Sequence, residues 1–144
     1  MVMSRNYYSE INLHLVWHTK NSLPLLTPTV EPLAHQSLTK RIVDWPGAFV
    51  HAIGGIETHV HVVVTVPPTL LISDFLGQLK GGSSHDVNHR GPGNSKSLEW
   101  QAGYGVVSFG TGDLPWVVAY VRSQREHHAN RTAQERLERI ATEE

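Results

Sequence analysis

The sequence predicts an α+β fold, and three observations support this prediction. Four short runs of residues alternate in polarity or are rich in β-branched and aromatic side chains, as strands are. Three longer segments repeat apolar residues at helical spacing and begin near good capping residues. At 144 residues the chain is also long enough to bury about two thirds of its unfolded surface without disulfides. We therefore expect residues 1–144 to form a single domain.

The expected elements follow one another in a defined order. Strands are expected at 11–18, 48–56, 59–66 and 104–109, and helices at 30–43, 69–80 and from 113 toward the C-terminus. In the first strand the odd-numbered residues form the apolar face, so His14 and His18 share the opposite face with Asn12. Only Glu57 and Thr58 separate the second and third strands, and such a short link favours an antiparallel hairpin.

Local sequence signals set the expected ends of the helices. The expected N-caps are Thr27 or Thr29, Thr69 or Ser73, and Asp113. Pro115 then falls in the first turn of the C-terminal helix, where no amide hydrogen is missed. The glycines and serines of 81–84 are expected to close or interrupt the second helix. The polar segment 85–97 is then expected to be the longest flexible connection.

The order β-α-β-β-α-β-α is that of a ferredoxin-like split βαβ domain with one added helix. We expect a four-stranded antiparallel sheet with helices on one face, followed by the added C-terminal helix. In this topology the third strand is central and lies beside the first.

Composition restricts the possible functions without selecting one. The chain lacks cysteine, which excludes thiol catalysis and cysteine-ligated zinc. The net charge is −1 and the sequence pI is about 6.8, so a basic surface for nucleic acid would have to be local. No apolar run approaches the roughly 20 residues of a membrane span, and the first residues lack the apolar centre of a secretory signal. We therefore expect a soluble, cytoplasmic protein that contacts no membrane.

Two histidines open the third strand in the pattern His59-Val60-His61. Alternate residues of a strand point the same way, so both imidazoles lie on one face, a few ångströms apart. Such a pair supplies half of a divalent-metal site. The ordinary interpretation is that both are polar-face residues, since the chain has ten histidines. A histidine-triad nucleotide hydrolase would need a third alternating histidine, but Val63 occupies that position.

Three residues of the C-terminal helix, Trp116, Tyr120 and Gln124, recur at four-residue steps. This spacing places them along one side of the helix. An aromatic row of this kind usually packs into the core. Gln124 favours a second interpretation, because an amide oxygen one turn beyond Tyr120 can bind a metal that the phenol also reaches.

Five segments of the chain, in this order, resemble a known family. They are 12–20, 59–61, 77–85, 100–105 and 120–128, which contain HLVWHTK, HVH, LKGGSS, WQAGYG and YVRSQREHH. They resemble the single-tyrosine HUH transposases of small bacterial insertion sequences, and within them the REP-associated tyrosine transposases. The order of the five segments makes the resemblance specific, although each segment alone is a weak signal.

The resemblance implies roles for particular residues. His59 and His61 would be metal ligands, with Gln124 as the third, and Tyr120 would be the catalytic nucleophile. The metal would be Mg²⁺ or Mn²⁺, and the enzyme a transposase that nicks single-stranded DNA bearing foldback hairpins. Attack by the tyrosine leaves a 5′-phosphotyrosine and a free 3′-hydroxyl, which rejoins strands by the reverse step. A phenol with a pKa of about 10 needs a cation on the scissile phosphate to attack near neutral pH.

Other residues are candidates for DNA binding or for the nucleophile. The DNA-binding candidates are Lys20, Lys80, Gly81, Gly82, Ser83 and Trp100. The lysines and loop amides would hold phosphates, and the tryptophan would stack on a base. Each also has an ordinary interpretation, as solvated surface or partly buried packing. Tyr104 is a rival nucleophile, but it has no amide or acid one helical turn away.

Two functional alternatives remain open on the sequence alone. In the first, the protein is a binding module whose sheet binds single-stranded nucleic acid without cleaving it. In the second, it is a small metal phosphoesterase in which the histidine pair activates water. For assembly, exposed sheet edges and the family resemblance both favour a homodimer. Gly110-Thr111-Gly112 is placed to act as a hinge through which the helix of Tyr120 is exchanged and acts in trans.

Overall fold

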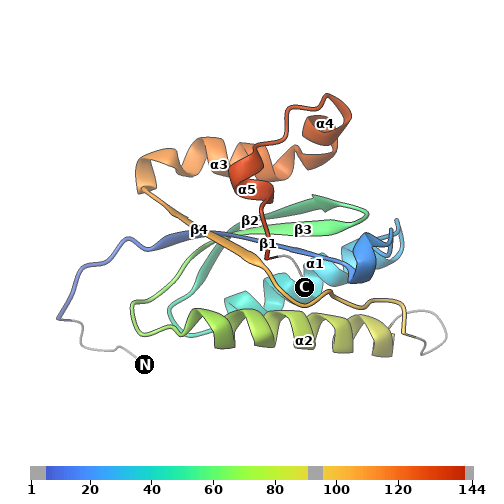
Figure 1. Cartoon of the computed structure of the whole chain (residues 1–144). Helices are drawn as coiled ribbons and strands as arrows, with labels where there is room; N and C mark the ends of the chain where they lie inside the picture. Colours follow the sequence, from blue (N-terminus) through green and yellow to red (C-terminus); the bar gives the residue numbers. More distant parts are fainter. Residues whose placement is uncertain (1–5, 91–95, 142–144) are drawn as a thin grey trace.

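Figure 1 shows the computed structural model of the chain, which describes residues 6–90 and 96–141. The strands are β1 (Asn12–His18), β2 (Phe49–Ile56), β3 (His59–Thr65) and β4 (Gly105–Phe109). The helices are α1 (Val30–Val43), α2 (Ile72–Arg90), α3 (Leu114–Arg122), α4 (Gln124–Ala129) and α5 (Glu135–Glu138), with short 3-10 helices at Lys20–Ser22 and Thr111–Asp113. The strand pairs are antiparallel in the order β2-β3-β1-β4, so the predicted ferredoxin-like sheet is confirmed.

The sheet separates two layers of helices (Figure 1). α1 and α2 cover one face, and α3, α4 and α5 lie over the other. The main core fills the first interface, where each fully buried apolar side chain contributes roughly 1.5–3 kcal/mol. Its buried members include Leu13, Leu15, Trp17, Val60, Val62, Val64, Leu38, Ile42, Phe75, Leu76 and Leu79. Because the odd residues of β1 belong to this core, the polar residues of β1 face the second layer, as predicted.

Strand register gathers histidines on the second face. In the β1–β3 pair, His18 lies opposite His59 and Val16 lies opposite His61. β3 is central, as predicted, with β1 on one side and β2 on the other. His14 is two residues from Val16 along β1, so it is a diagonal neighbour of His61.

Two glycines let chain segments approach this second face closely. A Cβ on Gly54 would lie 2.0 Å from the carbonyl oxygen of Val121, near the end of α3. A Cβ on Gly105 would lie 2.0 Å from the carbonyl oxygen of Arg139, just after α5. The backbone of α3 and of the C-terminal segment can therefore rest directly on the sheet. Gly54 is paired with His61 in the β2–β3 ladder, so one of these contacts adjoins the histidines.

The helix starts agree with the sequence signals in two cases of three. The Thr27 hydroxyl accepts a hydrogen bond from the Val30 amide at 3.1 Å, as expected of a capping residue. Asp113 precedes α3, and a proline lies in the first turn. The expectation that a helix begins at 69 is wrong. The amide of Leu70 instead closes a turn onto the Pro67 carbonyl at 3.1 Å, and α2 begins at Ile72.

α2 continues through 81–84 to Arg90, so the prediction of a helix end there is wrong. Gly82 leaves room for Arg41, whose Cζ lies 2.2 Å from where a Gly82 Cβ would be. Arg41 donates two 3.1 Å hydrogen bonds to the Asp86 carboxylate, one turn further along α2. Such tertiary contacts offset a helix penalty of about 1 kcal/mol per glycine. The predicted flexible connection is accordingly wrong for 85–90, and 91–95 lie outside the described residues.

Neither α2 nor any other helix that the structure describes is long and apolar enough to cross a membrane.

The single C-terminal helix expected from Asp113 is divided into α3 and α4, so this expectation is wrong in part. The backbone leaves helical geometry at Ser123, with φ −107° and ψ 28°. At the end of α3, the Tyr120 carbonyl accepts hydrogen bonds from the Ser123 amide at 3.3 Å and from the side-chain amide of Gln124 at 3.2 Å. Trp116 is 48 % exposed, whereas Tyr120 and Gln124 are buried, so the three do not form one buried row.

Candidate active site

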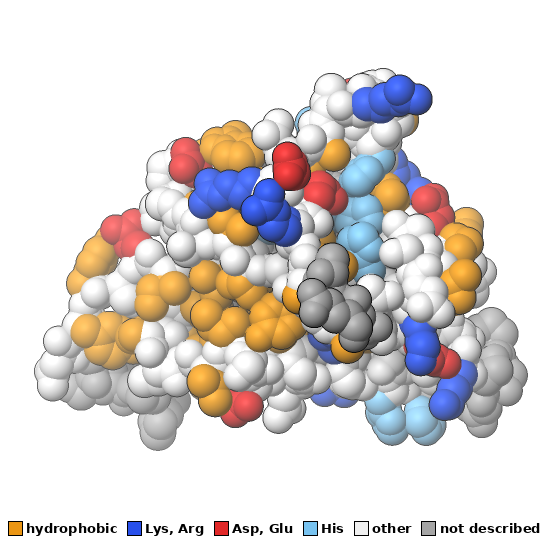
Figure 2. Space-filling model, viewed as in Figure 1, with side chains coloured by type: hydrophobic (Ala, Val, Ile, Leu, Met, Phe, Trp, Pro, Cys, Tyr) orange, Lys and Arg blue, Asp and Glu red, His pale blue; other side chains and the backbone are white. Residues whose placement is uncertain are grey.

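His59 and His61 lie at the start of β3, on the face that α4 and α5 cover. Both side chains are buried, and their Nε2 atoms reach the same carboxylate oxygen, Oε1 of Glu138, at 3.2 and 3.1 Å. Nδ1 of His59 is 3.0 Å from the Thr58 hydroxyl. Figure 2 shows a narrow band of imidazole atoms at the surface beside acidic side chains, with a second, separate histidine patch at the lower edge of the view. The histidine pair predicted from the sequence therefore faces a shared centre.

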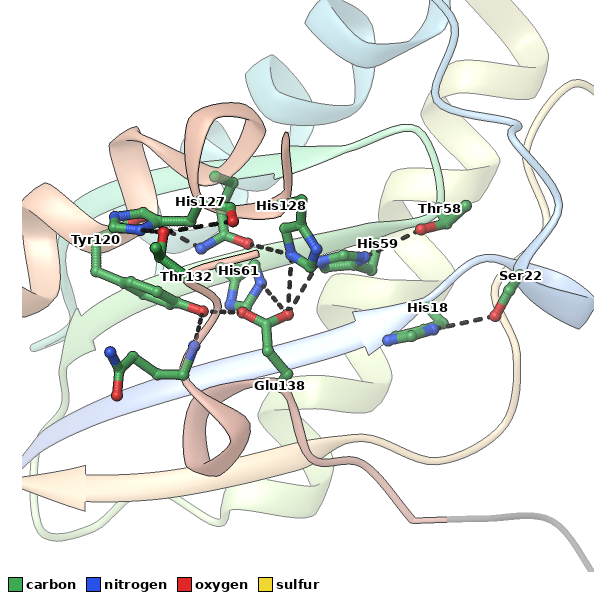
Figure 3. A network of polar contacts seen from close by, with 12 residues as sticks. His18, Ser22, Thr58, His59, His61, Tyr120, His127, His128, Thr132 and Glu138 are labelled. Atoms are coloured by element: carbon green, nitrogen blue, oxygen red, sulfur yellow. Dashed lines mark hydrogen bonds and ion pairs between the residues drawn. The ribbon is translucent and has the colours of Figure 1, made fainter. Parts of the chain in front are cut away.

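α4 and α5 complete this centre with His128 and Glu138 (Figure 3). Nε2 of His128 lies 3.3 Å from Oε1 of Glu138. One ligand-type atom from each of His59, His61, His128 and Glu138 falls within 4.8 Å of the others, and we call these four residues the histidine cluster. About 29 % of the His128 side chain and 18 % of the Glu138 side chain are exposed. The histidine cluster is thus closed by the sheet and accessible from the α4 and α5 side.

The histidine cluster combines a charged carboxylate with an uncharged imidazole. Burial raises the pKa of Glu138, but contacts with the imidazoles of His59 and His61 outweigh burial and hold its pKa well below the usual range. Burial lowers the pKa of His61, although the neighbouring Glu138 opposes this change. Glu138 is therefore ionised at neutral pH and His61 is neutral. Neutral imidazoles and ionised carboxylates are the forms of these side chains that bind metals.

Tyr120 reaches the histidine cluster through its phenol. The O–H donates a hydrogen bond to Oε2 of Glu138, and the Gln134 amide donates to the phenol oxygen at 2.8 Å. The ring packs against His127, with 4.7 Å between ring centroids. Burial, and next the contact with Glu138, raise the pKa of Tyr120 to about 12. In this arrangement the phenol is protonated at neutral pH and is oriented by two partners.

Gln124 borders the histidine cluster, and two hydrogen bonds set the orientation of its side chain. Its amide nitrogen donates to the Tyr120 carbonyl, which leaves Oε1 to accept from Nε2 of His128 at 3.1 Å. Nε2 of His128 is thus shared between Oε1 of Gln124 and Oε1 of Glu138. The oxygen of Gln124 therefore points toward the histidine cluster, and His128 stands between it and the carboxylate.

The donor set fits a divalent metal ion. Nε2 of His59 is buried and makes no well-aligned hydrogen bond with any described residue, although Glu138 is 3.2 Å away. A buried ring nitrogen without a partner is unfavourable unless a ligand takes its lone pair. His59 and His61 offer nitrogens, while Glu138 and Gln124 offer oxygens. Imidazole suits transition metals, and carboxylate or amide oxygens suit Mg²⁺ and Mn²⁺.

Three of the predicted DNA-binding residues make contacts within the protein, on the side of the sheet that α2 covers (Figure 1). The Lys80 ammonium donates to the Gln101 and Gly103 carbonyls at 2.7 and 3.0 Å. The Trp100 indole donates to the Ser83 hydroxyl at 2.9 Å. These hydrogen bonds join α2 to the segment that leads into β4, and α2 lies on the opposite face from the histidine cluster.

The other predicted residues are not members of the histidine cluster. Gly81 and Gly82 are inside α2, where amides bond along the helix, so the expectation that these residues form a loop is wrong. Lys20 is exposed and lies 3.9 Å from a Glu99 oxygen. Tyr104, the rival nucleophile, is half-buried just before β4.

The sequence patterns did not identify His128 and Glu138 as members of the histidine cluster. His128 was detectable, because it continues the four-residue spacing of Tyr120 and Gln124. Glu138 has no comparable local signal. Its position depends on the turn after α4, where the Thr132 amide bonds back to the His127 carbonyl at 2.8 Å.

The fold of this chain is shared with two solved structures. A protein from Deinococcus radiodurans R1 that is named as a candidate transposase is 23 % identical, with a TM-score of 0.66, over 84 % of this chain and 95 % of that one. A REP-associated tyrosine transposase bound to a REP hairpin is 19 % identical, with a TM-score of 0.63, over 89 % of this chain and 74 % of that one. Curated protein sequences include no match to the chain.

The chain is also similar to a protein family over most of its length. The family model is described as "Transposase IS200 like" and matches residues 7–124. The matched segment includes His59, His61, Tyr120 and Gln124, and it ends before His128 and Glu138. Because the match spans far more than half of the chain, the protein belongs to the IS200-like transposase family.

Proposed function

We propose that the protein cleaves and rejoins single-stranded DNA at hairpin-bearing ends, with Tyr120 forming a 5′-phosphotyrosine. The observation that carries the proposal is that one carboxylate, Glu138, contacts both the Tyr120 phenol and the histidine pair. A nucleophile and a candidate metal site are therefore adjacent. The solved relative bound to a REP hairpin supports a hairpin-bearing substrate for this fold.

The proposed cofactor is Mg²⁺ or Mn²⁺, held by His59, His61 and Gln124, with Glu138 as an additional oxygen donor. When bound, such a cation withdraws charge from the scissile phosphate and stabilises the crowded transition state. His59 and His61 need little reorganisation for this role, because both are buried on the central strand. For Gln124 to join them, the His128 ring must turn away from the space between the two side-chain oxygens.

Tyr120 performs the covalent step in this proposal. Its phenol oxygen forms a bond to phosphorus while the bond from phosphorus to the 3′-oxygen breaks. The phenol proton leaves to water and the 3′-oxygen takes up a proton, so the released strand ends in a free 3′-hydroxyl. Attack by a 3′-hydroxyl reverses these changes and joins strands. Glu138 is a weak base because its pKa is lowered, so its role is to orient the phenol rather than to keep the proton.

A groove between β4 and the C-terminal segment offers a path for the DNA strand to Tyr120. Its lining includes Gln134, Arg136 and Arg139. The Gln134 amide donates to the phenol oxygen, so the groove adjoins the nucleophile. The two arginines suit contact with phosphates. We propose that this groove, with the exposed Lys20, contributes more to DNA binding than Lys80, Ser83 and Trp100 do.

We also propose a homodimer, because β2 and β4 are the edge strands of the described sheet and edge strands favour pairing between copies. In the described chain, Tyr120 lies near the histidine pair of its own chain, because Glu138 contacts both, and this favours assembly of the proposed site within one copy. Exchange of α3 through Gly110-Thr111-Gly112 would place Tyr120 in the site of a second copy.

The test of the proposed function is a covalent adduct between protein and DNA. Incubation with single strands that carry foldback hairpins, in Mn²⁺, should give an adduct that survives a denaturing gel. Tyr120→Phe should abolish the adduct, and Tyr104→Phe, which removes the phenol oxygen of the rival nucleophile but keeps its ring, should retain it. An undiminished adduct in Tyr120→Phe would show that Tyr120 is not the nucleophile. Cleavage without any adduct would indicate attack by water, and tight binding without cleavage would indicate a binding module.

A further inference from the structure

We infer that His14 is a positioning residue for His61, and that their hydrogen bond sets which ring nitrogen of His61 faces the metal site. His14 lies within β1 and is fully buried, on the face that carries the histidine cluster. Its Nε2 lies 2.7 Å from Nδ1 of His61, and the ring centroids are 4.9 Å apart. The inference rests on the proposed role of His61 as a metal ligand.

The surroundings of His14 offer its ring little other polar contact. In strand register it lies between Val63 of β3 and Val107 of β4. Its Nδ1 is buried and has no hydrogen-bond partner among the residues that the structure describes. An apolar residue would avoid this unpartnered nitrogen, because an unpaired buried polar atom is unfavourable. The hydrogen bond to His61 is therefore the contact that explains a histidine at this position.

The His14–His61 hydrogen bond can be made in two ways. The His14 ring is fully buried and its Nδ1 has no partner among the described residues, which favours the neutral imidazole, with one N–H and one lone pair. In the described arrangement, Nε2 of His61 faces the Glu138 carboxylate and carries the proton, so Nδ1 of His61 accepts from His14. When His61 gives its Nε2 lone pair to a cation, its proton is on Nδ1 and is donated to His14. His14 serves both states, because its Nε2 donates in one tautomer and accepts in the other.

Two substitutions separate this positioning role from packing. His14→Leu removes the hydrogen bond and fills the buried site with an apolar side chain. It removes the unpartnered Nδ1 of His14 but leaves Nδ1 of His61 without a partner, so the protein should fold with a melting temperature close to that of the wild type. His14→Gln supplies a side-chain amide, which donates through its nitrogen or accepts through its oxygen after a flip of the amide group. His51→Leu is the matched control, because His51 also makes a 2.7 Å side-chain hydrogen bond from the same sheet, to Thr65.

Metal affinity is measured on the full chain without DNA, by titrating Mn²⁺ and following the free ion by electron paramagnetic resonance. We expect His14→Leu to lose about 10–100-fold in Mn²⁺ affinity, the range typical of residues that orient a metal ligand. His14→Gln should recover most of this loss, and His51→Leu should bind like the wild type. Wild-type affinity in a folded His14→Leu variant would overturn the inference.

Nitrogen NMR of the histidine rings, in the metal-free protein, tests the hydrogen bond itself. His14→Leu should move the Nδ1 resonance of His61 toward that of an unbonded imidazole nitrogen, and His51→Leu should leave it in place. An unchanged resonance in His14→Leu would overturn the inference. A wild-type protein that binds no Mn²⁺ would overturn the proposed metal site together with this inference. Normal wild-type binding with an unaffected His14→Leu variant would overturn this inference alone.

Discussion

The phenol of Tyr120 donates a hydrogen bond to Oε2 of Glu138, while Oε1 of the same carboxylate contacts His59 and His61. One side chain of α5 thus links the proposed nucleophile to the histidine pair. This arrangement keeps the phenol protonated, because burial and the carboxylate raise its pKa to about 12. Through Glu138, a change in the protonation or metal binding of the histidine pair should therefore alter the pKa of Tyr120.

Glu138→Gln should lower the pKa of Tyr120. The substitution removes a negative charge that disfavours phenolate, but burial remains, so the pKa should stay above its ordinary value of about 10. The change is measured by the ultraviolet absorbance of tyrosinate during a pH titration, with Tyr120→Phe as the blank. Glu135→Gln is the matched control, since Glu135 lies on the same short helix and pairs with Arg139 at the surface. An unchanged titration in Glu138→Gln would show that Glu138 does not control the phenol.

The affinity for Mn²⁺ should depend on the histidine pair. Substitutions of Gln124 and Glu138 should show which of the two side chains supplies an oxygen ligand. His61→Ala should reduce affinity by more than the roughly 10–100-fold typical of residues that only orient a ligand. Gln124→Ala and Glu138→Ala should each reduce it by at least about tenfold, if each supplies an oxygen. His85→Ala, on the exposed side of α2, is the control. Wild-type binding in Gln124→Ala would leave Glu138 as the oxygen donor and exclude Gln124 from the ligands.

Stability should fall as the pH drops below about 6.5, because buried histidines are neutral in the folded chain. Burial lowers the pKa of His14 from 6.5 to about 3. Between these two values the unfolded chain binds more protons, so the contribution of His14 is fully present above 6.5 and is lost as pH falls toward 3. The slope from one such residue is at most about 1.4 kcal/mol per pH unit. Urea unfolding at a series of pH values should show a shallower slope in His14→Leu, and equal slopes would contradict this account.

Two neighbouring glycines of α2 should respond differently to alanine. A Cβ on Gly81 would meet no described atom within 4 Å, so Gly81→Ala should stabilise the protein by up to about 1 kcal/mol. A Cβ on Gly82 would lie 2.2 Å from Cζ of Arg41 and would displace the guanidinium from Asp86. Gly82→Ala should therefore be less stable than Gly81→Ala by about 1 kcal/mol or more in urea unfolding. Equal stabilisation by both substitutions would show that the Arg41 contact does not need this space.

The assembly of the active site can be tested by mixing two inactive proteins. Tyr120 lies beside His59 and His61 of its own chain, so we expect mixed dimers of His61→Ala and Tyr120→Phe to form no adduct with DNA. Exchange of α3 between copies would instead create one complete site, and adduct formation would recover. Recovery in demonstrably mixed dimers would therefore establish assembly in trans. A protein that is monomeric and fully active at micromolar concentration would overturn the proposed homodimer.

The sequence by itself determined which residues form the sheet and which face they occupy. Alternation in β1 commits Leu13, Leu15 and Trp17 to the main core, because burial of such side chains dominates the free energy of folding. The histidines of β1 and β3 then lie on the other face, whatever path the rest of the chain takes. The spacing of Tyr120 and Gln124 also remained informative across the break at Ser123, because the Gln124 amide bonds back to the Tyr120 carbonyl.

Only the tertiary structure decided the length of α2, the division of the C-terminal helix and the position of Glu138. α2 extends past its glycines because Ser83 is buried against the Trp100 indole and Arg41 pairs with Asp86, and local helix propensity contains neither contact. Glu138 lies 18 residues after Tyr120, and its place depends on the packing of Leu137 in the second core. Contacts between distant parts of the chain leave no periodic pattern in the sequence. The histidine pair and the tyrosine could therefore be predicted from the residues, whereas the carboxylate that joins them depended on the folded path of the C-terminal segment.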